Sequence, residues 1–596
     1  MTTESTTKGA DGFYHPAGED ELVDLVKTAY REGRQLRVRG AAHSVSHAIY
    51  TDPLGGMPNH VEQQSPPPGD NVNVMLDRHR GWRVVDEERR IVEAEAGIHL
   101  GADPSDPTGT ATLESSLLWQ LWNDKGWTLS DTGGITHQTV SGFTATGSSG
   151  GSLQFSVNQN LLGMRVIDGT GEVHELSADD PDPDEFYAMS PSLGLLGVVS
   201  TVTFQCVETF NISGQEAVTT IEDCAVDLFG DGGDGRPSLE AFLRDAEYAR
   251  VEWWPQRGAE RVLVWQCQQM RPQLGFRPAR YEEFTDRPEA AEVAFSVLFT
   301  IIGNLDDLSQ AKPKLEATFD QLEGVLELVA AEKGLGRVGQ VLAKFLSHAL
   351  EHGVDAAITV LEPFAGLIRR ELPSLFPRLL AIFLSLDSEK AGMQEGEPQC
   401  FRDWAWQGLP MDNQADDVLL PTEFTEAWIP LGRTQQVMQL LNGYFTEPSD
   451  DHEAYRRTGS YAWELYTAMP SRFWMAASHS DGADEWKDGA FRVDCGPRCG
   501  LGVGGGRRPM AGEPGGRVES GRGAAASTAA ARQREGSVRR TRRHRRGLAG
   551  PPRGGRGRAA VAVSERCAPR PGPASAAAAP GGVAPLAARS GLARLS

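Results

Sequence analysis

The chain has few cysteines and no long apolar run. Seven cysteines are scattered over 596 residues, and their low, odd number argues against a disulfide framework and favours a reducing compartment. No stretch of about 18 consecutive apolar residues occurs, so the sequence predicts no membrane-spanning helix. The first residues, MTTESTTKGADG, are polar and contain no apolar segment typical of a secretory signal. These absences predict a cytoplasmic protein.

The last hundred residues lack most residue types that build a core. After residue 500 there is no Phe, Trp, Tyr, Ile, Asn, Asp or Lys. Such a segment cannot bury enough apolar surface to offset the entropy cost of ordering, so we expect 495–596 to be disordered. Its Gly, Ala, Arg and Pro have GC-rich codons, as a frameshift in a GC-rich gene would produce. A genuine arginine-rich tail that binds nucleic acid is the alternative.

Two motifs fall in or beside this tail. GVGGGRR and the Cys495/Cys499 pair follow no strand that opens into a helix, so we assign neither a nucleotide site nor a metal site. The tail also contains 19 Arg against 4 Glu, which leaves the first 500 residues with a formal net charge of -38. A body this acidic is well solvated and is not expected to bind nucleic acid.

The front of the chain predicts an alternation of helices and strands. Residues 19–33 have helical periodicity that ends at Gly33, and 114–126 form a second amphipathic pattern that ends at Gly126. Runs rich in Val and Ile predict strands and hairpins between and after these helices. The predicted strand regions are 35–40, 71–77, 83–97, 160–177 and 197–210.

The pattern changes after residue 210. Aromatic-rich strands are predicted within 248–270, and strands resume at 421–431 and 460–478. Between them, 296–392 repeats apolar residues at helical spacing, which predicts an insertion of several helices. The apolar segment LFPRLLAIFLSL within it could lie on a membrane surface, but a packed helix is the favoured interpretation.

Residues 131–151, DTGGITHQTVSGFTATGSSGG, are the most informative stretch. Glycines let backbone amides approach a ligand, Ser and Thr add short hydroxyl donors, and consecutive amides in such turns bind anions. Ile135, Val140 and Phe143 recur through the stretch, which a flexible linker would not need. A phosphate-bearing cofactor is the better explanation. No lysine follows the glycines and no G-x-G-x-x-G lies in a βαβ unit, which disfavours P-loop and Rossmann sites.

This stretch is the second of three segments that together resemble a known family. RVRGAAHSVS precedes it by about 90 residues, and SPSLGLLGVVSTVTFQC follows it. In order and spacing they resemble the FAD-binding domain of the vanillyl-alcohol oxidase (PCMH-type) family, in the branch of sugar-lactone and alditol oxidases. The resemblance covers about 10–212.

The resemblance, together with the helical periodicity and the composition of the tail, implies an α+β fold with five parts. A PCMH-type FAD-binding domain of two α+β subdomains covers 10–212. A substrate domain with an antiparallel sheet takes 213–295 and 396–494. The helical insertion takes 296–395, and the disordered tail takes 495–596.

The resemblance also implies which residues hold FAD. His43 matches the histidine that many members bond to the 8α-methyl carbon of the flavin. Ala41 and Ala42 stand where glycines are more usual, and Ser149 replaces a histidine. Gly133 stands where lactone dehydrogenases of the branch have alanine, which implies that O2 can reach the flavin. The predicted contacts are Arg39, Gly40, Ala41, Ala42, His43, Ser44, Gly133, Gly134, Thr139, Gly142, Thr146, Gly147, Ser148, Ser149, Gly197 and Val199, with no metal.

The chemistry implied is hydride transfer from a CH–OH carbon of a sugar lactone or polyol to flavin N5, after which O2 is reduced to H2O2. Glu464, in AWELYTA, is the candidate that orients substrate or handles its proton, because burial on an aromatic-rich strand would raise its pKa. An exposed carboxylate on a strand face is the alternative. Members often have E-x-R here, where Tyr466 replaces the arginine. Arg472 and His479 are the other catalytic candidates, and the family's C-terminal H-W-x-K motif is absent.

Three alternatives remain open. The chain could be a dehydrogenase that passes electrons to a quinone or cytochrome. It could oxidise a bulky apolar, sterol-like alcohol, as the helical insertion and the missing arginine suggest. It could also be an inactive flavoprotein that lacks its last active-site strands. We expect a small alcohol or lactone and O2 as partners, and membrane association remains the less favoured alternative.

Overall fold

The computed structural model describes residues 7–495 apart from gaps. The larger gaps are 52–65, 282–296, 372–383, 387–396, 414–424 and 447–461, and shorter ones occur elsewhere. The predicted disordered tail beyond residue 495, with GVGGGRR and Cys499, lies outside the described residues. So does nearly all of the apolar segment 375–386.

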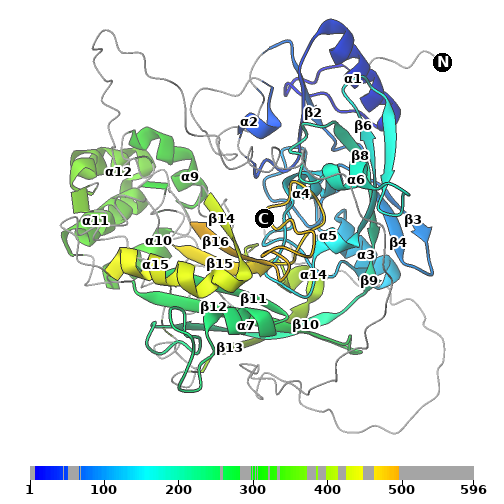
Figure 1. The fold of residues 1–596 in the computed structure, drawn as a ribbon. Helices are drawn as coiled ribbons and strands as arrows, with labels where there is room; N and C mark the ends of the chain where they lie inside the picture. The colour runs from blue at the N-terminus through cyan, green and yellow to red at the C-terminus, as the bar shows by residue number, and fades with distance from the viewer. Residues whose placement is uncertain are drawn as a thin grey trace, which may run out of the picture.

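The N-terminal lobe is built on a five-stranded antiparallel sheet, and Figure 1 shows it in blue and cyan. Its strand order is β3-β4-β8-β6-β7. The helices on this lobe end where glycine permits a positive φ: Gly33 has φ 65° and Gly126 has φ 67°. The sheet's strands are β3 (Trp82–Asp86), β4 (Ile91–Glu95), β6 (Leu161–Ile167), β7 (Val173–Ser177) and β8 (Val198–Gln205), and the two helices are α1 (Glu19–Glu32) and α3 (Leu117–Lys125).

Smaller elements complete this lobe. Strands β1 (Leu36–Arg39) and β2 (Val72–Met75) form a parallel pair, and the chain between them carries His43. A short antiparallel pair joins β5 (Trp127–Thr128) to β9 (Val207–Glu208). The short helices are α2 (Ser46–Ile49), α4 (Val140–Thr146), α5 (Val157–Asn160) and α6 (Asp184–Ala188).

A seven-stranded antiparallel sheet forms the second lobe, at the lower left of Figure 1. Its order, β13-β10-β12-β11-β15-β16-β14, brings strands from both sides of the helical segment together, because β13 joins one edge and β15 pairs with β11. The strands are β10 (Asn211–Thr219), β11 (Tyr248–Trp254), β12 (Arg261–Met270), β13 (Gln399–Trp404), β14 (Thr425–Pro430), β15 (Trp463–Ala468) and β16 (Ala490–Cys495).

Helices lie between β12 and β13, as the apolar periodicity predicts, and pack in one core with the aromatic side chains of the sheet. No helix in the described part of the chain is both long enough and apolar enough to cross a membrane. These helices are η1 (Leu308–Ala311), α9 (Lys312–Ala317), α10 (Leu322–Ala331), α11 (Gly336–His352), α12 (Val354–Leu361) and η4 (Glu362–Phe364). Elsewhere in the second lobe are α7 (Leu239–Asp245), α14 (Ala405–Gly408), η6 (Leu431–Arg433) and α15 (Thr434–Thr446).

The α+β prediction is confirmed, but three details differ from the prediction. The strand predicted over 460–478 ends at Ala468, because a turn begins at Ser471. The Ser471 hydroxyl accepts a hydrogen bond from the Phe473 amide, and the Ser471 amide donates one to the Ser478 carbonyl. The glycine-rich stretch contains α4, which the sequence did not indicate. Cys400 is disulfide-bonded, so the expectation of reduced cysteines fails there, whereas Cys206, Cys224 and Cys267 are free.

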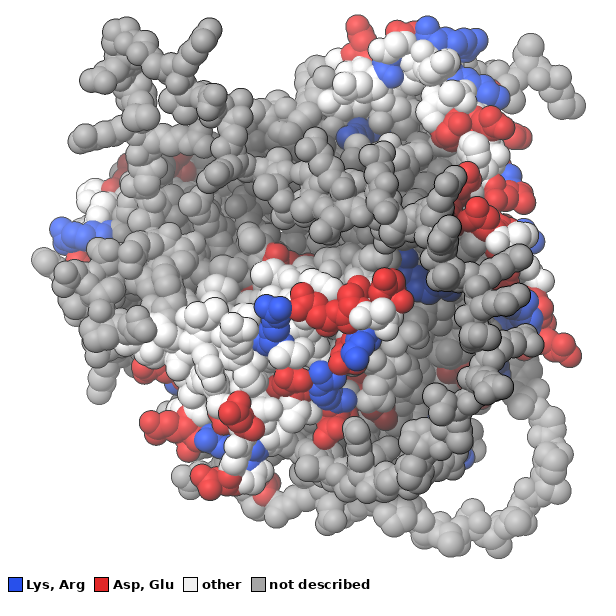
Figure 2. Space-filling model, in the orientation of Figure 1, with Lys and Arg blue, Asp and Glu red and all other residues white. Residues whose placement is uncertain are grey.

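Charged side chains of both signs lie on the face drawn in Figure 2. Acidic and basic groups alternate along its right-hand edge, over α1 and the β3–β4 hairpin. One exposed pair in this region joins Arg83 to Glu93 at 2.9 Å. The large negative charge of the first 500 residues is therefore partly balanced locally on this edge.

Candidate functional site

Three segments far apart in the sequence form one groove, which we call the N-terminal groove. It is lined by residues within 36–49, 138–146 and 192–199, and its empty volume is about 920 Å³, part of it open to solvent. The Gly40 backbone packs on the Thr139 side chain, since a Cβ at Gly40 would lie 2.7 Å from the Thr139 hydroxyl oxygen. Thr139 also caps α4 by accepting a hydrogen bond from the Gly142 amide at 3.1 Å. Each of the three predicted motifs therefore contributes one wall.

Most of the predicted cofactor contacts lie in this groove. The predicted residues that line it are Gly40, Ala41, Ala42, His43, Ser44, Thr139, Gly142, Thr146, Gly197 and Val199. Further lining residues that the sequence reasoning missed include Arg37, Gln138, Ser141, Ala145, Ser192 and Gly194. Gln138 and Ser141 lie inside the stretch 131–151, and residues 192–194 lie in the third motif. The motifs themselves could therefore have indicated these lining residues.

The other predicted contacts lie outside the groove. Arg39 is buried, with its guanidinium near the Met75 sulfur and the Phe13 ring. Ser148 does not line the groove, but its hydroxyl bonds two residues that do, Thr146 at 3.0 Å and Gln138 at 3.1 Å. Gly133 and Gly134 face Phe143 and Asp412, while Gly147 and Ser149 line a separate cavity with Trp428.

Ala42 is held in a backbone conformation that favours glycine. Its φ is 64°, which costs an L residue about 1–2 kcal/mol, whereas glycine adds about 0.5–1 kcal/mol of chain entropy cost. We therefore expect Ala42→Gly to raise the free energy of unfolding by about 0.5–1 kcal/mol in urea titrations. Ala41→Gly is the matched control and should lower it, because Ala41 has no positive φ. Equal effects of both substitutions would contradict the account.

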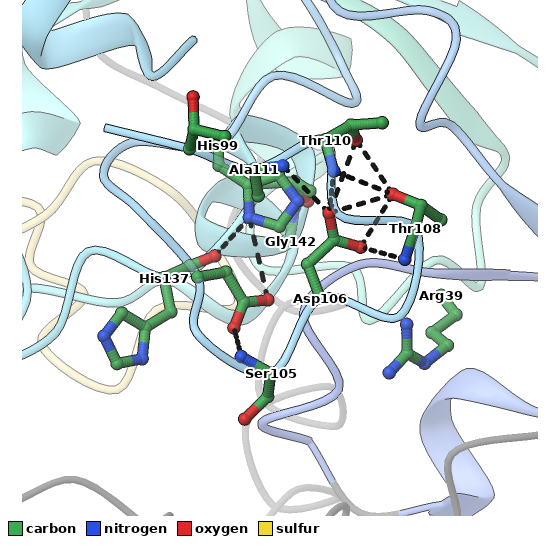
Figure 3. A network of polar contacts seen from close by, with 12 residues as sticks. Arg39, His99, Ser105, Asp106, Thr108, Thr110, Ala111, His137 and Gly142 are labelled. Carbon is green, nitrogen blue, oxygen red and sulfur yellow. Dashed lines mark hydrogen bonds and ion pairs between the residues drawn. The ribbon is translucent and has the colours of Figure 1, made fainter. Parts of the chain in front are cut away.

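Behind His43 lies a buried polar network, and Figure 3 shows most of its members. The His43 ring lies 5.5 Å from the ring of His137, whose carbonyl accepts from His99 Nδ1 at 2.5 Å. Burial lowers the pKa of His99, although Asp103 at 3.9 Å opposes the shift, so His99 stays neutral near pH 7. Asp106 fixes the neighbouring loop by accepting from the Thr110 and Ala111 amides at 2.7 and 2.8 Å. The network gives the His43 segment a rigid support.

The stretch 131–151 connects the N-terminal groove to the seven-stranded sheet. Gly151 accepts from the Ala249 amide at 2.9 Å, and the Tyr248 hydroxyl donates to the Ser130 carbonyl at 2.6 Å. Gly150 donates to the buried Asp131 carboxylate at 3.2 Å, which closes the stretch into a loop. Burial raises the pKa of Asp131 to about 7. One loop thus touches both lobes.

Four carboxylates stand side by side across the sheet, and we call them the carboxylate row. In strand register, Glu252 on β11 lies opposite Glu464 on β15, Glu464 opposite Asp494 on β16, and Asp494 opposite Glu426 on β14. Residues directly opposite one another share a face, where like charges repel. The row therefore requires cations nearby, and the sheet supplies two arginines.

Arg250 is the first of these arginines. It lies two residues from Glu252 on β11, hence on the same face, and its side chain is 2% exposed. Its Nη1 lies 3.3 Å from Glu252 and 3.6 Å from Glu464, and it also bonds Asp412. Three carboxylates thus share one buried guanidinium.

Arg492 is the second arginine, and it lies opposite Tyr466 in register. Its guanidinium stacks 3.9 Å from the Tyr466 ring centroid and 4.4 Å from that of Trp428, and pairs with Glu426. It also donates to the Ser149 carbonyl at 2.8 Å. The arginine absent from position 466 is therefore replaced, on the same face, by one from the neighbouring strand.

This environment changes the acidity of the row. Burial is the main reason that the pKa of Glu464 rises to about 8; Arg250 opposes the rise, and Asp494 and Glu252 add to it. Burial also raises the pKa of Asp494 to about 7, against the attraction of Arg492. The alternative of an exposed Glu464 is excluded, because its side chain is 16% exposed. Glu464 is thus a weak acid poised to exchange a proton near neutral pH.

The other two catalytic candidates do not join this cluster. Arg472 is exposed and stacks 4.2 Å over the Tyr187 ring of the N-terminal lobe. His479 lies in the turn after Ser471 and donates its backbone amide to Ala476. No contact among the described residues links either side chain to Glu464. The residues that do surround it, Arg250, Glu252, Asp412, Arg492 and Asp494, were missed. Four of them form charged pairs spaced by two: Arg250 and Glu252 stand on a predicted strand, whereas Arg492 and Asp494 stand on β16, which was not predicted.

No family model matches the chain, but individual proteins of known function are similar to it. D-arabinono-1,4-lactone oxidase of Saccharomyces cerevisiae is 26% identical over 244 residues, which are 41% of this chain and 39% of that protein. L-gulono-1,4-lactone dehydrogenase of Mycobacterium tuberculosis is 27% identical over 224 residues, 37% of this chain and 43% of that protein. The chain thus matches about two fifths of the length of these curated relatives.

Among solved structures, cholesterol oxidase from Brevibacterium sterolicum superposes with a TM-score of 0.48 and 14% identity, over 81% of this chain and 76% of that one. The resemblance predicted from the three motifs is confirmed at the level of sequence relatives. Over about two fifths of its length, the chain is similar in sequence to these sugar-lactone oxidases and dehydrogenases.

Proposed function

We propose that the chain is an FAD-dependent oxidoreductase that oxidises a CH–OH group of a sugar lactone or polyol. The observation that carries the proposal is the loop 131–151, which lines the N-terminal groove and also contacts Arg492 beside the carboxylate row. The names of the lactone-oxidising relatives support the substrate class.

The N-terminal groove fits FAD by its construction. The absence of a side chain at Gly40 makes room for the Thr139 hydroxyl. The hydroxyls of Ser44, Ser141 and Thr146 line the same groove, where they would bond a diphosphate. The apolar side chains of Val38, Ile49 and Val199 line the same groove and suit the flat faces of a nucleotide. A bound flavin would supply the acceptor for the substrate's hydride.

In the proposed reaction, the chain's own residues position the alcohol and handle its proton. Glu464 in its carboxylate form accepts the hydroxyl proton as the carbon loses hydride. Arg250, 3.6 Å away, stabilises the negative charge that develops before the proton is transferred. Stacking between Trp428 and Tyr466 holds Arg492 rigidly at the Ser149 end of the loop, so the sheet and loop keep a fixed relation.

Covalent attachment of the flavin through His43 is part of the proposal. Its imidazole lines the groove and packs on His137, which would hold it in place for attachment. We expect acid-denatured protein to keep its yellow colour and flavin fluorescence, and His43→Ala to release all of its flavin. His174→Ala, at an exposed hairpin, is the control and should retain it. Free flavin in the acid supernatant of the unaltered protein would exclude the bond.

We further propose that O2 is the electron acceptor, with Gly133 as the residue that admits it. A Cβ at Gly133 would lie 3.3 Å from both a Phe143 ring carbon and the Ile135 carbonyl oxygen, so alanine fits only if both shift by a few tenths of an ångström. Gly133→Ala should lower peroxide release at least tenfold and leave dye reduction nearly unchanged. Peroxide and dye assays with L-gulono-1,4-lactone measure both. Dye reduction without peroxide in the unaltered protein would favour the dehydrogenase alternative.

A further inference from the structure

A cavity beside β13 lies outside the groove and the carboxylate row, and we call it the β13 cavity. Its empty volume is about 680 Å³, part of it open to solvent, a size that suits a small organic molecule. Five of its eight lining residues carry polar side chains. Those five are Arg280, Tyr281, Asp403, Gln407 and Asn413.

The polar groups are arranged around an aromatic wall. Tyr281 packs on Phe401 with ring centroids 4.9 Å apart, and both residues are buried. Arg280, at 45% side-chain exposure, pairs through Nε with the buried Asp403 at 2.9 Å. Backbone hydrogen bonds between Ala279 and Arg402 fix this arrangement by joining the 279–281 segment to β13.

Gln407, on α14, lines the cavity with an amide that is hydrogen-bonded to no described residue. A primary amide offers two donors and an acceptor that takes two hydrogen bonds. An apolar ligand would bury this amide without new partners, which costs free energy. The cavity is therefore built for a ligand with several hydroxyls.

The cavity is also connected to the proposed active site. Asn413, in the cavity wall, binds Thr136 of the loop 131–151. Its side chain accepts a hydrogen bond from the Thr136 amide at 3.1 Å and donates one to the Thr136 hydroxyl at 3.0 Å. The preceding residue, Asp412, bonds Arg250 and donates its amide to the Gly134 carbonyl at 2.8 Å. Asn413 thus lines the cavity, while its neighbour Asp412 bonds the buried guanidinium of Arg250.

We propose that the β13 cavity is a subsite for a carbohydrate, either a lactone ring or a polyol chain, and this inference rests on the proposed function. A sugar has an apolar C–H face, which packs on the Tyr281–Phe401 wall, and a rim of hydroxyls, which bond to Asp403, Gln407 and Arg280. The subsite selects polyhydroxylated alcohols over apolar ones of similar size.

The test uses calorimetric titration of the FAD-loaded chain with L-gulono-1,4-lactone, and with cyclohexanol as the apolar probe. Gln407→Leu, similar in volume, should weaken lactone binding and raise its KM at least about tenfold, with kcat little changed, because the hydrogen bonds of one amide are lost. Gln273→Leu makes the same change on an exposed loop and should alter neither. Cyclohexanol binding should not weaken in Gln407→Leu. If Gln407→Leu does not fold, Gln407→Met repeats the test with an unbranched side chain.

The outcomes separate this inference from the proposed function. Turnover of the lactone by the unaltered chain, with unchanged KM in Gln407→Leu, would overturn the subsite and leave the function standing. Lactone binding that Gln407→Leu abolishes, in a chain that never oxidises lactone, would support the subsite and overturn the function. An unaltered chain that binds cyclohexanol but no lactone would overturn the subsite.

Discussion

Glu464→Gln is expected to lower kcat with a sugar lactone by about 100- to 10,000-fold, the usual contribution of a positioned proton acceptor. Glutamine keeps the shape of the side chain but cannot accept the hydroxyl proton. Steady-state kinetics on the FAD-loaded chain measure the effect, with flavin content as the check that the cofactor is still bound. Glu222→Gln, at an exposed position, is the matched control and should leave kcat unchanged.

The pH dependence has a definite sign. The pKa of Glu464 is raised to about 8, so the carboxylate that accepts the proton becomes more abundant as pH increases. kcat/KM should therefore rise through this region and level off above it, and the rising limb should disappear in Glu464→Gln. A flat profile, or a Glu464→Gln variant with full activity, would show that Glu464 does not handle the proton.

Arg250→Met is expected to lower the free energy of unfolding by about 3–5 kcal/mol near pH 8, because it leaves buried carboxylates without their cation. Glu252, Asp412 and Glu464 have oxygen atoms within 4.8 Å of one another around this guanidinium. Urea unfolding should show a smaller loss of unfolding free energy at pH 5. At that pH these carboxyl groups can bind protons, so the repulsion among them falls.

Arg83→Met is the matched control for this prediction. Arg83 is 65% exposed and pairs with Glu93 on the surface, so its loss should cost less than about 1 kcal/mol at either pH. Equal losses at the two positions, or a loss at Arg250 that does not depend on pH, would contradict the account of the carboxylate row.

The N-terminal groove could be predicted from sequence because its signals are local. Gly40, Thr139 and Gly197 each stand in a short motif whose residue types already indicate close backbone approach and hydroxyl donors. Order and spacing then indicate the resemblance to the sugar-lactone oxidases. The helix α4 escaped prediction because Gly142 and several Thr weaken helix propensity, while the Thr139 cap and Gly147, with φ 66°, define its ends.

The carboxylate row could not be predicted because it depends on strand order and register. Glu252 and Glu464 lie 212 positions apart in sequence, and only the pairing of β11 with β15 places them opposite each other. Arg492 replaces the arginine missing at Tyr466 only because β16 pairs with β15 in one register. The spacing by two in R-x-E and R-x-D predicts a shared face, but not which strands will be neighbours.

Reduction of the bound flavin by substrate, with oxygen excluded, tests the central claim most directly. The account predicts that L-gulono-1,4-lactone or D-arabinono-1,4-lactone bleaches the visible flavin absorption of the FAD-loaded chain, and that admitting air restores it with release of H2O2. Absorption that no lactone or polyol bleaches, in a chain that has bound FAD, would contradict the proposed oxidation of a sugar CH–OH group.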